Sequence, residues 1–205
     1  MRVAVQQLIQ AVANINPSLF QETSFAELHG MVNLIVELKE DSSLIQVLDF
    51  NTCKHRTDAG LGCRRLAFDC VKSMVKAARR SPKLLTYWGS TGELIDALVA
   101  ASNADDKGEI CAELNRAAKE ILCLIAALYP LVQFSKSQME SLTARLGNDI
   151  SGNYAASSEK TALKIDALMT IDKLMRSAPF AQNKEFQALY RRAQKDQLLA
   201  AALRQ

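Results

Sequence analysis

The sequence predicts an all-α fold of stacked helices, and three observations support this prediction. Apolar residues recur every three or four positions through most of the 205 residues, which is the period of an amphipathic helix. The 8 Gly, 4 Pro and 6% aromatic residues supply few breakers and few strand formers, which disfavours an all-β fold. The 49% apolar and 23% charged residues are close to the globular average and exclude whole-chain disorder. We therefore expect one helical domain over residues 1–205.

The helices of the first half are placed by their apolar stripes and boundary residues. Pro17 follows the first of them, and Ser24 opens the second in a capping-box spacing with Glu27. Ser81-Pro82 has the form of an N-cap followed by proline in the first turn. A polar loop is expected over 51–58. The expected helices cover residues 2–15, 24–39, 43–50, 59–80, 81–88 and 90–101.

The second half continues the same pattern. The helix over 107–129 is apolar on nearly all sides after Glu120, so we expect it to be the central helix. A capping box at Ser137 and Glu140 opens the next helix, which should end at Leu146-Gly147. Two Gly and two Asn within a short span predict a hinge over 147–157. The expected helices cover residues 107–129, 137–146, 158–177 and 183–203.

The order of long and short helices points to a repeat architecture. Long helices begin near Asp58, Asp106 and Ser157, a spacing of roughly 50 residues. Cys63–Arg80, Ser81–Trp88 and Ser90–Ala101 form a unit of long helix, short turn and medium helix. This layout resembles the armadillo/HEAT class of α-solenoids. The resemblance implies a superhelix of repeats that share one elongated core, and a role in protein–protein interaction. An antiparallel helix bundle of the vinculin or talin rod type explains the same periodicity and remains the alternative.

Charge gives the sharpest local feature. Between Lys54 and Lys83 the chain holds nine basic and two acidic residues, an excess of seven positive charges against +3 for the whole chain. At 100° per residue, several of the basic residues fall in one narrow arc of the helix over 59–80. We expect this ridge, with Trp88 as an apolar anchor, to bind a partner. The candidate partner-binding residues are Arg65, Lys72, Lys76, Arg79, Arg80, Lys83 and Trp88.

Two other interpretations of the same residues stay open. A basic ridge is also what an ordinary solvated helix face looks like, and Trp88 also fits a core position between two helices. A nucleic-acid-binding helical domain would use the same helix, 59–83, against phosphates. The expected partner is a protein with an acidic or amphipathic helical segment, because few aromatic residues lie near the ridge to stack on bases.

Catalytic, metal and cofactor sites find little support, so we expect a non-enzymatic protein without a cofactor. His29 and His55 are the two histidines, and neither belongs to a recognisable catalytic motif or phosphate-binding loop. Cys53 and His55 with Cys63 and Cys70 lack the two close ligand pairs of a structural zinc site. Acidic residues at 105–109 are explained by the helix dipole.

The cysteines and the N-terminus indicate an intracellular protein. Five cysteines with irregular spacing, mostly at apolar helix positions, are typical of reduced, buried thiols. Gln6, Gln7 and Gln10 interrupt any signal-peptide centre. The longest apolar run, Ile121–Tyr129, is too short for a membrane span. We expect a cytoplasmic location, with a nuclear one as the alternative, and no membrane partner.

Overall fold

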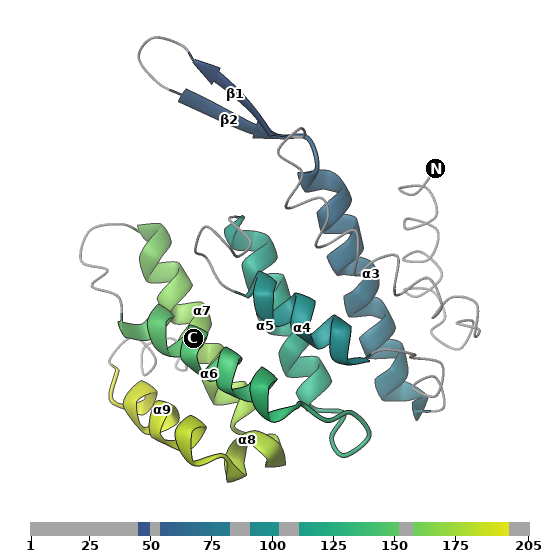
Figure 1. Cartoon of the computed structure of the whole chain (residues 1–205), viewed down its shortest axis with the longest axis vertical. Helices are drawn as coiled ribbons and strands as arrows, with labels where there is room; N and C mark the ends of the chain where they lie inside the picture. Colours follow the sequence, from purple (N-terminus) through teal and green to yellow (C-terminus); the bar gives the residue numbers. More distant parts are fainter. Residues whose placement is uncertain (1–44, 50–53, 83–90, 103–110, 152–157, 197–205) are drawn as a thin grey trace. The chain divides into compact units, whose positions relative to one another are not determined.

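The computed structural model describes residues 45–49, 54–82, 91–102, 111–151 and 158–196. These residues form seven α-helices and one two-stranded sheet (Figure 1), so the mainly helical composition is confirmed. The chain divides into two compact units, Met1–Ala97 and Leu98–Gln205. The expected helices over 2–15 and 24–39 lie outside the described residues, as does most of the short one over 81–88. The expectation of a single domain is not tested by the division and stays a prediction.

The first unit contains a β-hairpin where the sequence predicts a helix. Strands β1 (Ile45–Asp49) and β2 (Lys54–Asp58) pair antiparallel, with a register that runs from Ile45↔Asp58 to Asp49↔Lys54. The predicted helix over 43–50 is therefore wrong, and so is the predicted loop for residues 54–58. Five residues that are mainly apolar fit a short strand as well as a short helix, and pairing with a second segment decides between them.

Helix α3 (Leu61–Arg80) follows the hairpin and confirms the long helix expected over 59–80. Its apolar stripe is buried from Ala67 to Ala78, as the three-and-four spacing favours, while Leu61 and Leu66 nearer its start are half-buried. Helix α4 (Thr91–Ala101) comes next and crosses the boundary between the two units. The fully buried residues of α3 include Ala67, Phe68, Cys70, Val71, Met74, Val75, Ala77 and Ala78.

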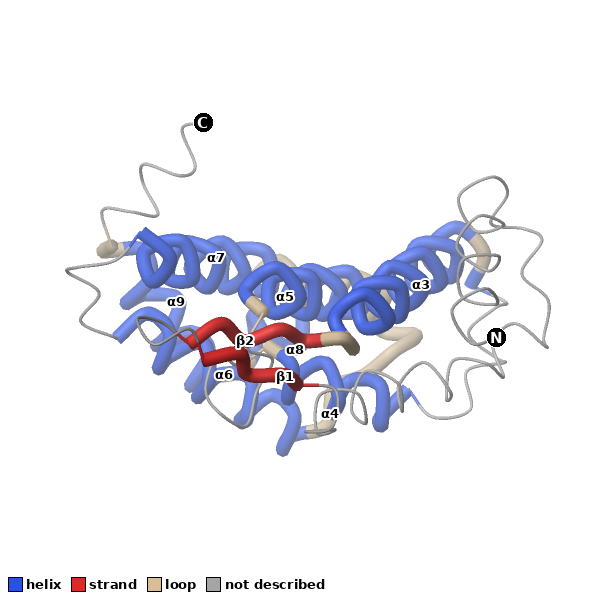
Figure 2. The backbone as a smooth tube through the Cα atoms, turned by 90° about the horizontal axis from the view of Figure 1, so that it is seen from above, coloured by secondary structure: helices blue, strands red, loops and turns tan. Residues whose placement is uncertain are grey.

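The second unit arranges its helices in two layers. Helices α5 (Ala112–Ala126) and α7 (Ser158–Leu174) lie side by side in one layer, and α6 (Lys136–Ser151) and α9 (Lys184–Gln194) in the other (Figure 2). The short helix α8 (Ala178–Gln182) packs against α9. Helix α7 packs against α5, α6 and α9. The helix expected at the centre, over 107–129, corresponds to α5, which packs against α7 and contacts α4 through Asn115 and α6 through Lys119. Its central place stays a prediction.

Three phenylalanines close one end of the core of the second unit. The ring of Phe180 meets those of Phe134 and Phe186 edge to face, with centroid separations of 5.1 and 4.9 Å. Such contacts add stabilisation beyond the buried area. Pro179 stands in the first turn of α8, and Asn183 caps α9 by accepting a hydrogen bond from the Phe186 N–H at 2.9 Å. The helix expected over 158–177 ends earlier, at Leu174, and the short helix α8 that follows was not expected. The helix expected over 183–203 begins at Lys184 after its Asn183 cap, but it ends at Gln194, so its predicted end is wrong.

Helix α6 begins and ends at residues other than those predicted. The Gln138 N–H donates to Ser135 Oγ at 3.2 Å, and the Ser135 N–H donates to Gln138 Oε1 at 2.9 Å. This is a capping box two residues before the expected one at Ser137, so the prediction of that box is wrong. The helix continues through Gly147 to Ser151, and the predicted end at Leu146-Gly147 is also wrong. Residues 152–157 of the predicted hinge lie outside the described residues.

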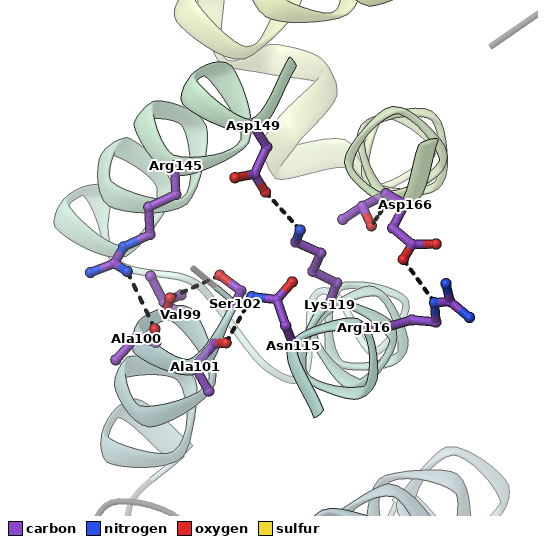
Figure 3. A network of polar contacts seen from close by, with 11 residues as sticks. Val99, Ala100, Ala101, Ser102, Asn115, Arg116, Lys119, Arg145, Asp149 and Asp166 are labelled. Carbon is purple, nitrogen blue, oxygen red and sulfur yellow. Dashed lines mark hydrogen bonds and ion pairs between the residues drawn. The ribbon is translucent and has the colours of Figure 1, made fainter. Parts of the chain in front are cut away.

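A buried ion pair joins the two layers (Figure 3). Lys119 Nζ on α5 lies 2.7 Å from Asp149 Oδ2 on α6, and the two residues are only 1% and 7% exposed. The contact lets each buried charge face an opposite one, since little water reaches them. Asn115, one turn before Lys119, is also buried, and its Oδ1 has no hydrogen-bond partner in the described part of the chain.

The carboxyl end of α4 is closed by side chains of α5 and α6. Asn115 Nδ2 donates to the Ala101 carbonyl at 3.1 Å, and Arg145 Nη1 donates to the Ala100 carbonyl at 3.3 Å (Figure 3). Ser102 Oγ donates to the Val99 carbonyl at 2.8 Å. The last carbonyls of a helix have no partner within the helix, and these three donors supply hydrogen bonds to carbonyls at the end of α4.

Replacing Lys119 by Met should lower the free energy of unfolding by about 3–5 kcal/mol, because Asp149 is then left buried without its counter-charge. Urea denaturation followed by circular dichroism measures the loss. Adding Asp149→Leu to Lys119→Met should recover part of it, since no unpaired charge remains. Lys136→Met is the matched control: it breaks the exposed Lys136–Glu140 pair at 3.5 Å and should cost no more than about 0.5 kcal/mol. Equal losses in the two single variants would contradict this account.

Candidate interaction surface

The turn between β2 and α3 is fixed by one carboxylate. Asp58 Oδ1 accepts a hydrogen bond from the Gly60 N–H at 2.9 Å, and Asp58 Oδ2 lies 2.6 Å from Arg64 Nη2. Arg64 is buried, with 3% of its surface exposed. A charge-assisted contact of this kind is stronger than a neutral hydrogen bond. The pair therefore fixes the first turn of α3, and Arg64 adds nothing to the outer charge of the helix although it contributes to the sequence count.

The outer face of α3 carries most of the basic residues that the sequence singles out. Arg65, Lys76, Arg79 and Arg80 are exposed and Lys72 is half-buried. They lie opposite the buried stripe, because steps of 3, 4 and 7 residues return to nearly the same side of a helix. We refer to these five residues as the basic face of α3. Lys83 and Trp88, the other two candidate residues, lie outside the described residues.

The two halves of the basic face differ in their contacts. Arg65 and Lys72, in the first half, each interact with another part of the chain. Lys76, Arg79 and Arg80, in the second half, form no ion pair within the described ranges. Asp69 is the single acidic residue of α3, and it is exposed on the same face. The carboxyl-terminal half thus presents three positive charges to solvent over little more than one helical turn.

Helix electrostatics favours cations at this position. Arg79 and Arg80 stand in the last turn of α3, where the partial negative charge of the helix end stabilises positive side chains by about 0.3–1 kcal/mol each. This effect accounts for part of their placement without any ligand. Lys76 lies one turn earlier, where the helix-end effect has already fallen off.

A shallow groove of 320 Å³ lies between α6 and α9 in the second unit. Small side chains of α6, among them Gly147 and Ser151, form one wall. Glu185, Leu189 and Arg192 of α9 lie on the other side, and Arg192 Nη2 donates to Ser151 Oγ at 2.8 Å. Because this hydrogen bond already occupies Arg192 and the groove is open to solvent, its geometry specifies no ligand.

Four described cysteines are free thiols: Cys63, Cys70, Cys111 and Cys123. Burial raises the pKa of the Cys123 thiol from 9.0 to about 12; nearby Lys173 lowers it and Glu120 raises it by smaller amounts. The described residues contain no group of three His, Cys, Asp or Glu side chains placed to bind a metal ion. Cys53 lies outside the described residues, and with it the Cys53–His55 pair that was considered as a zinc-ligand pair.

Comparison with protein-family models, with curated protein sequences and with solved structures gave no match. Among the helices that the structure describes, none combines the length and apolar character that crossing a membrane requires.

The Cys123 thiol should resist alkylation, because the reactive species is the thiolate. At pH 8 a shift from 9.0 to about 12 lowers the thiolate fraction by a factor of about 100–1000. Iodoacetamide labelling read by peptide mass spectrometry should therefore modify Cys123 that much more slowly in the folded chain than in urea. The raised pKa also means that the unfolded chain ionises first, so stability from this group is complete below pH 9 and is lost as the pH approaches 12. Labelling at the same rate with and without urea would contradict the assignment.

Proposed function

We propose that this chain is a non-enzymatic protein–protein interaction module that binds an acidic, amphipathic helical segment on the basic face of α3. The observation that carries the proposal is the group Lys76, Arg79 and Arg80, which is exposed and free of ion pairs within the described part of the chain. Lys83 and Trp88, though outside the described residues, extend the proposed surface along the sequence.

The one-sided burial of α3 supports a role as a fixed platform. The helix spans 20 residues, about 30 Å at 1.5 Å per residue. Its buried stripe and the Asp58–Arg64 contact hold it in place, so the outer side chains keep their mutual spacing. A partner binds such a surface without paying the entropy of ordering the helix.

The spacing of the basic residues defines the complementary ligand. Lys72, Lys76 and Arg79 stand at positions i, i+4 and i+7 along one line of α3. A partner helix with Asp or Glu at the same spacing would place its carboxylates opposite them. Exposed ion pairs contribute only about 0–1 kcal/mol each. Charge would therefore set the association rate and the register, while apolar contacts beside the ridge would set the affinity.

The alternating layers of the second unit support the repeat architecture that we propose for the chain. In sequence order, α5 and α7 belong to one layer and α6 and α9 to the other. Alternation of this kind is typical of helix pairs stacked as in HEAT repeats. The free thiols in turn support a reducing, intracellular location.

Charge reversal on α3 tests the proposed function. The variant Lys76→Glu plus Arg79→Glu should weaken binding of a fluorescein-labelled helical peptide, with Glu at i, i+4 and i+7 beside a Leu stripe, by about tenfold or more. Fluorescence anisotropy measures the dissociation constant. Binding by the unmodified chain should weaken as NaCl rises, because salt screens exposed charges.

The matched control is Arg191→Glu plus Lys195→Glu. It makes the same change in residue types and net charge at exposed positions near the end of α9, and it should leave the dissociation constant within about twofold. Circular dichroism checks that both variants keep their helices. Equal loss of affinity in both variants would show that the net charge of the chain, and not the basic face of α3, determines binding, which would contradict the proposal. A DNA duplex that binds the unmodified chain more tightly than the peptide does would favour the nucleic-acid alternative.

A further inference from the structure

The β-hairpin presents two strand edges that differ in chemistry. The sheet has two strands, so in the described part of the chain each strand is paired on one side only. An unpaired edge offers a row of N–H and C=O groups to any other strand. A lone two-stranded hairpin is also only marginally stable in water and gains from an added strand.

The β2 edge is protected and the β1 edge is not. Strand β2 has the sequence KHRTD, with Lys54 and Arg56, and basic residues are a common defence of sheet edges. Strand β1 has the sequence IQVLD, without Lys, Arg or Pro. Val47, at its centre, is 59% exposed and is one of the few large apolar residues left in solvent among those described. Among the described residues, therefore, the edge that is best suited to pairing has no partner strand.

We propose that β1 pairs antiparallel with β1 of a second copy of this chain, around a two-fold axis at Val47. This register overlaps all five residues and places Val47 opposite its own copy, Ile45 opposite the second Asp49, and Gln46 opposite the second Leu48. Together with the observed pairing of β1 and β2, the result is one four-stranded antiparallel sheet in the order β2, β1, β1 of the second copy, β2 of the second copy.

Charge favours the second copy as the occupant of this edge. In the proposed register the two Asp49 residues stand four positions apart along the strands, about 13 Å, which exceeds the screening length in physiological salt. Each Asp49 keeps Lys54 as its observed neighbour. Pairing through β2 around its own centre would instead place Arg56 directly opposite Arg56, which is destabilising. Pairing of β1 with β2 of another copy would repeat from copy to copy without closing, whereas β1–β1 pairing closes at two copies.

The size of the contact sets the expected affinity. A ladder of five residues buries less than the roughly 1,200 Å² typical of a stable complex, so we expect a weak dimer that forms only at high protein concentration. This inference is independent of the proposed function, because β1 and the basic face of α3 share no residue.

Sedimentation equilibrium of the whole chain tests the dimer over about 1 µM to about 1 mM, the range in which weak complexes form. The apparent mass should rise from one chain to two and then level off. Val47→Lys places two like charges opposite each other and should raise the dimer dissociation constant by about tenfold or more. Thr57→Lys adds the same charge on β2 and should change it by less than about twofold. A chain that stays monomeric throughout, or one that grows beyond two copies, would overturn the proposal.

A cysteine at position 47, on the proposed two-fold axis, tests the register independently of Val47→Lys, which can disturb the hairpin itself. Residues directly opposite each other in an antiparallel pair have Cα atoms about 4.5–5.5 Å apart, within the range that a disulfide spans. Under mild oxidation Val47→Cys should give about ten times more 47–47-linked dimer than Gln46→Cys gives of 46–46-linked dimer, since Gln46 does not face its own copy. Peptide mass spectrometry separates these links from those of the five native cysteines. Equal yields of the two links would contradict the register.

Discussion

The pair of opposite charges between α5 and α6 constrains how the two layers of the second unit meet. Lys119 and Asp149 are both almost fully buried, and neither tolerates the loss of the other because desolvated charge is costly. An apolar contact would permit small sliding of one helix along the other, whereas the Lys119–Asp149 pair favours positions that keep the two charged groups in contact. The carbonyls at the end of α4, held by Asn115 and Arg145, fix a third segment to the same pair of helices. Polar contacts thus set the register, and apolar burial supplies most of the stabilisation.

The basic residues of α3 differ in burial, and burial decides which of them needs an internal partner. Arg64 is buried and has a carboxylate at 2.6 Å, as a desolvated cation requires. Lys76, Arg79 and Arg80 remain in water and need no internal partner. Within the described part of the chain these charges have no ion-pair partner, and an exposed charge of that kind costs little free energy. We therefore base the proposed function on the second half of α3 rather than on the total charge of the segment.

Local signals in the sequence were sufficient for much of the fold. The period of apolar residues places α3, α7 and the beginning of α9, because it acts over a few neighbouring residues. It does not place the short helix α8, which is too short to show a period. The hairpin is different. A strand as short as β1 lacks a distinctive period, and its conformation depends on residues five to thirteen positions away in β2. The start of α6 was misplaced because Ser135 and Ser137 offer similar caps, and only the reciprocal contact with Gln138 separates them.

In the candidate site, too, helix geometry predicts some features, and contacts between separate segments determine the others. Helix geometry alone puts Arg65, Lys72, Lys76 and Arg79 on one side of α3, and the observed exposure agrees with that arc. The internal use of Arg64 depends on Asp58 across a turn, which no helical period predicts. Lys119 does carry a detectable signal, since it and Asn115 interrupt the apolar face of their helix at a one-turn spacing. Asp149 carries none, because its segment has the composition of a loop.

The position of α4 has a practical consequence for dissecting the protein. The boundary between the units falls at Ala97, inside this helix. A truncation there would sever the helix in mid-turn. The shorter product would end in unsatisfied carbonyls, and the longer one would begin with a single frayed turn beneath the side chains of Asn115 and Arg145. Limited proteolysis or recombinant fragments should therefore leave residues 91–102 whole and attached to the carboxyl-terminal piece.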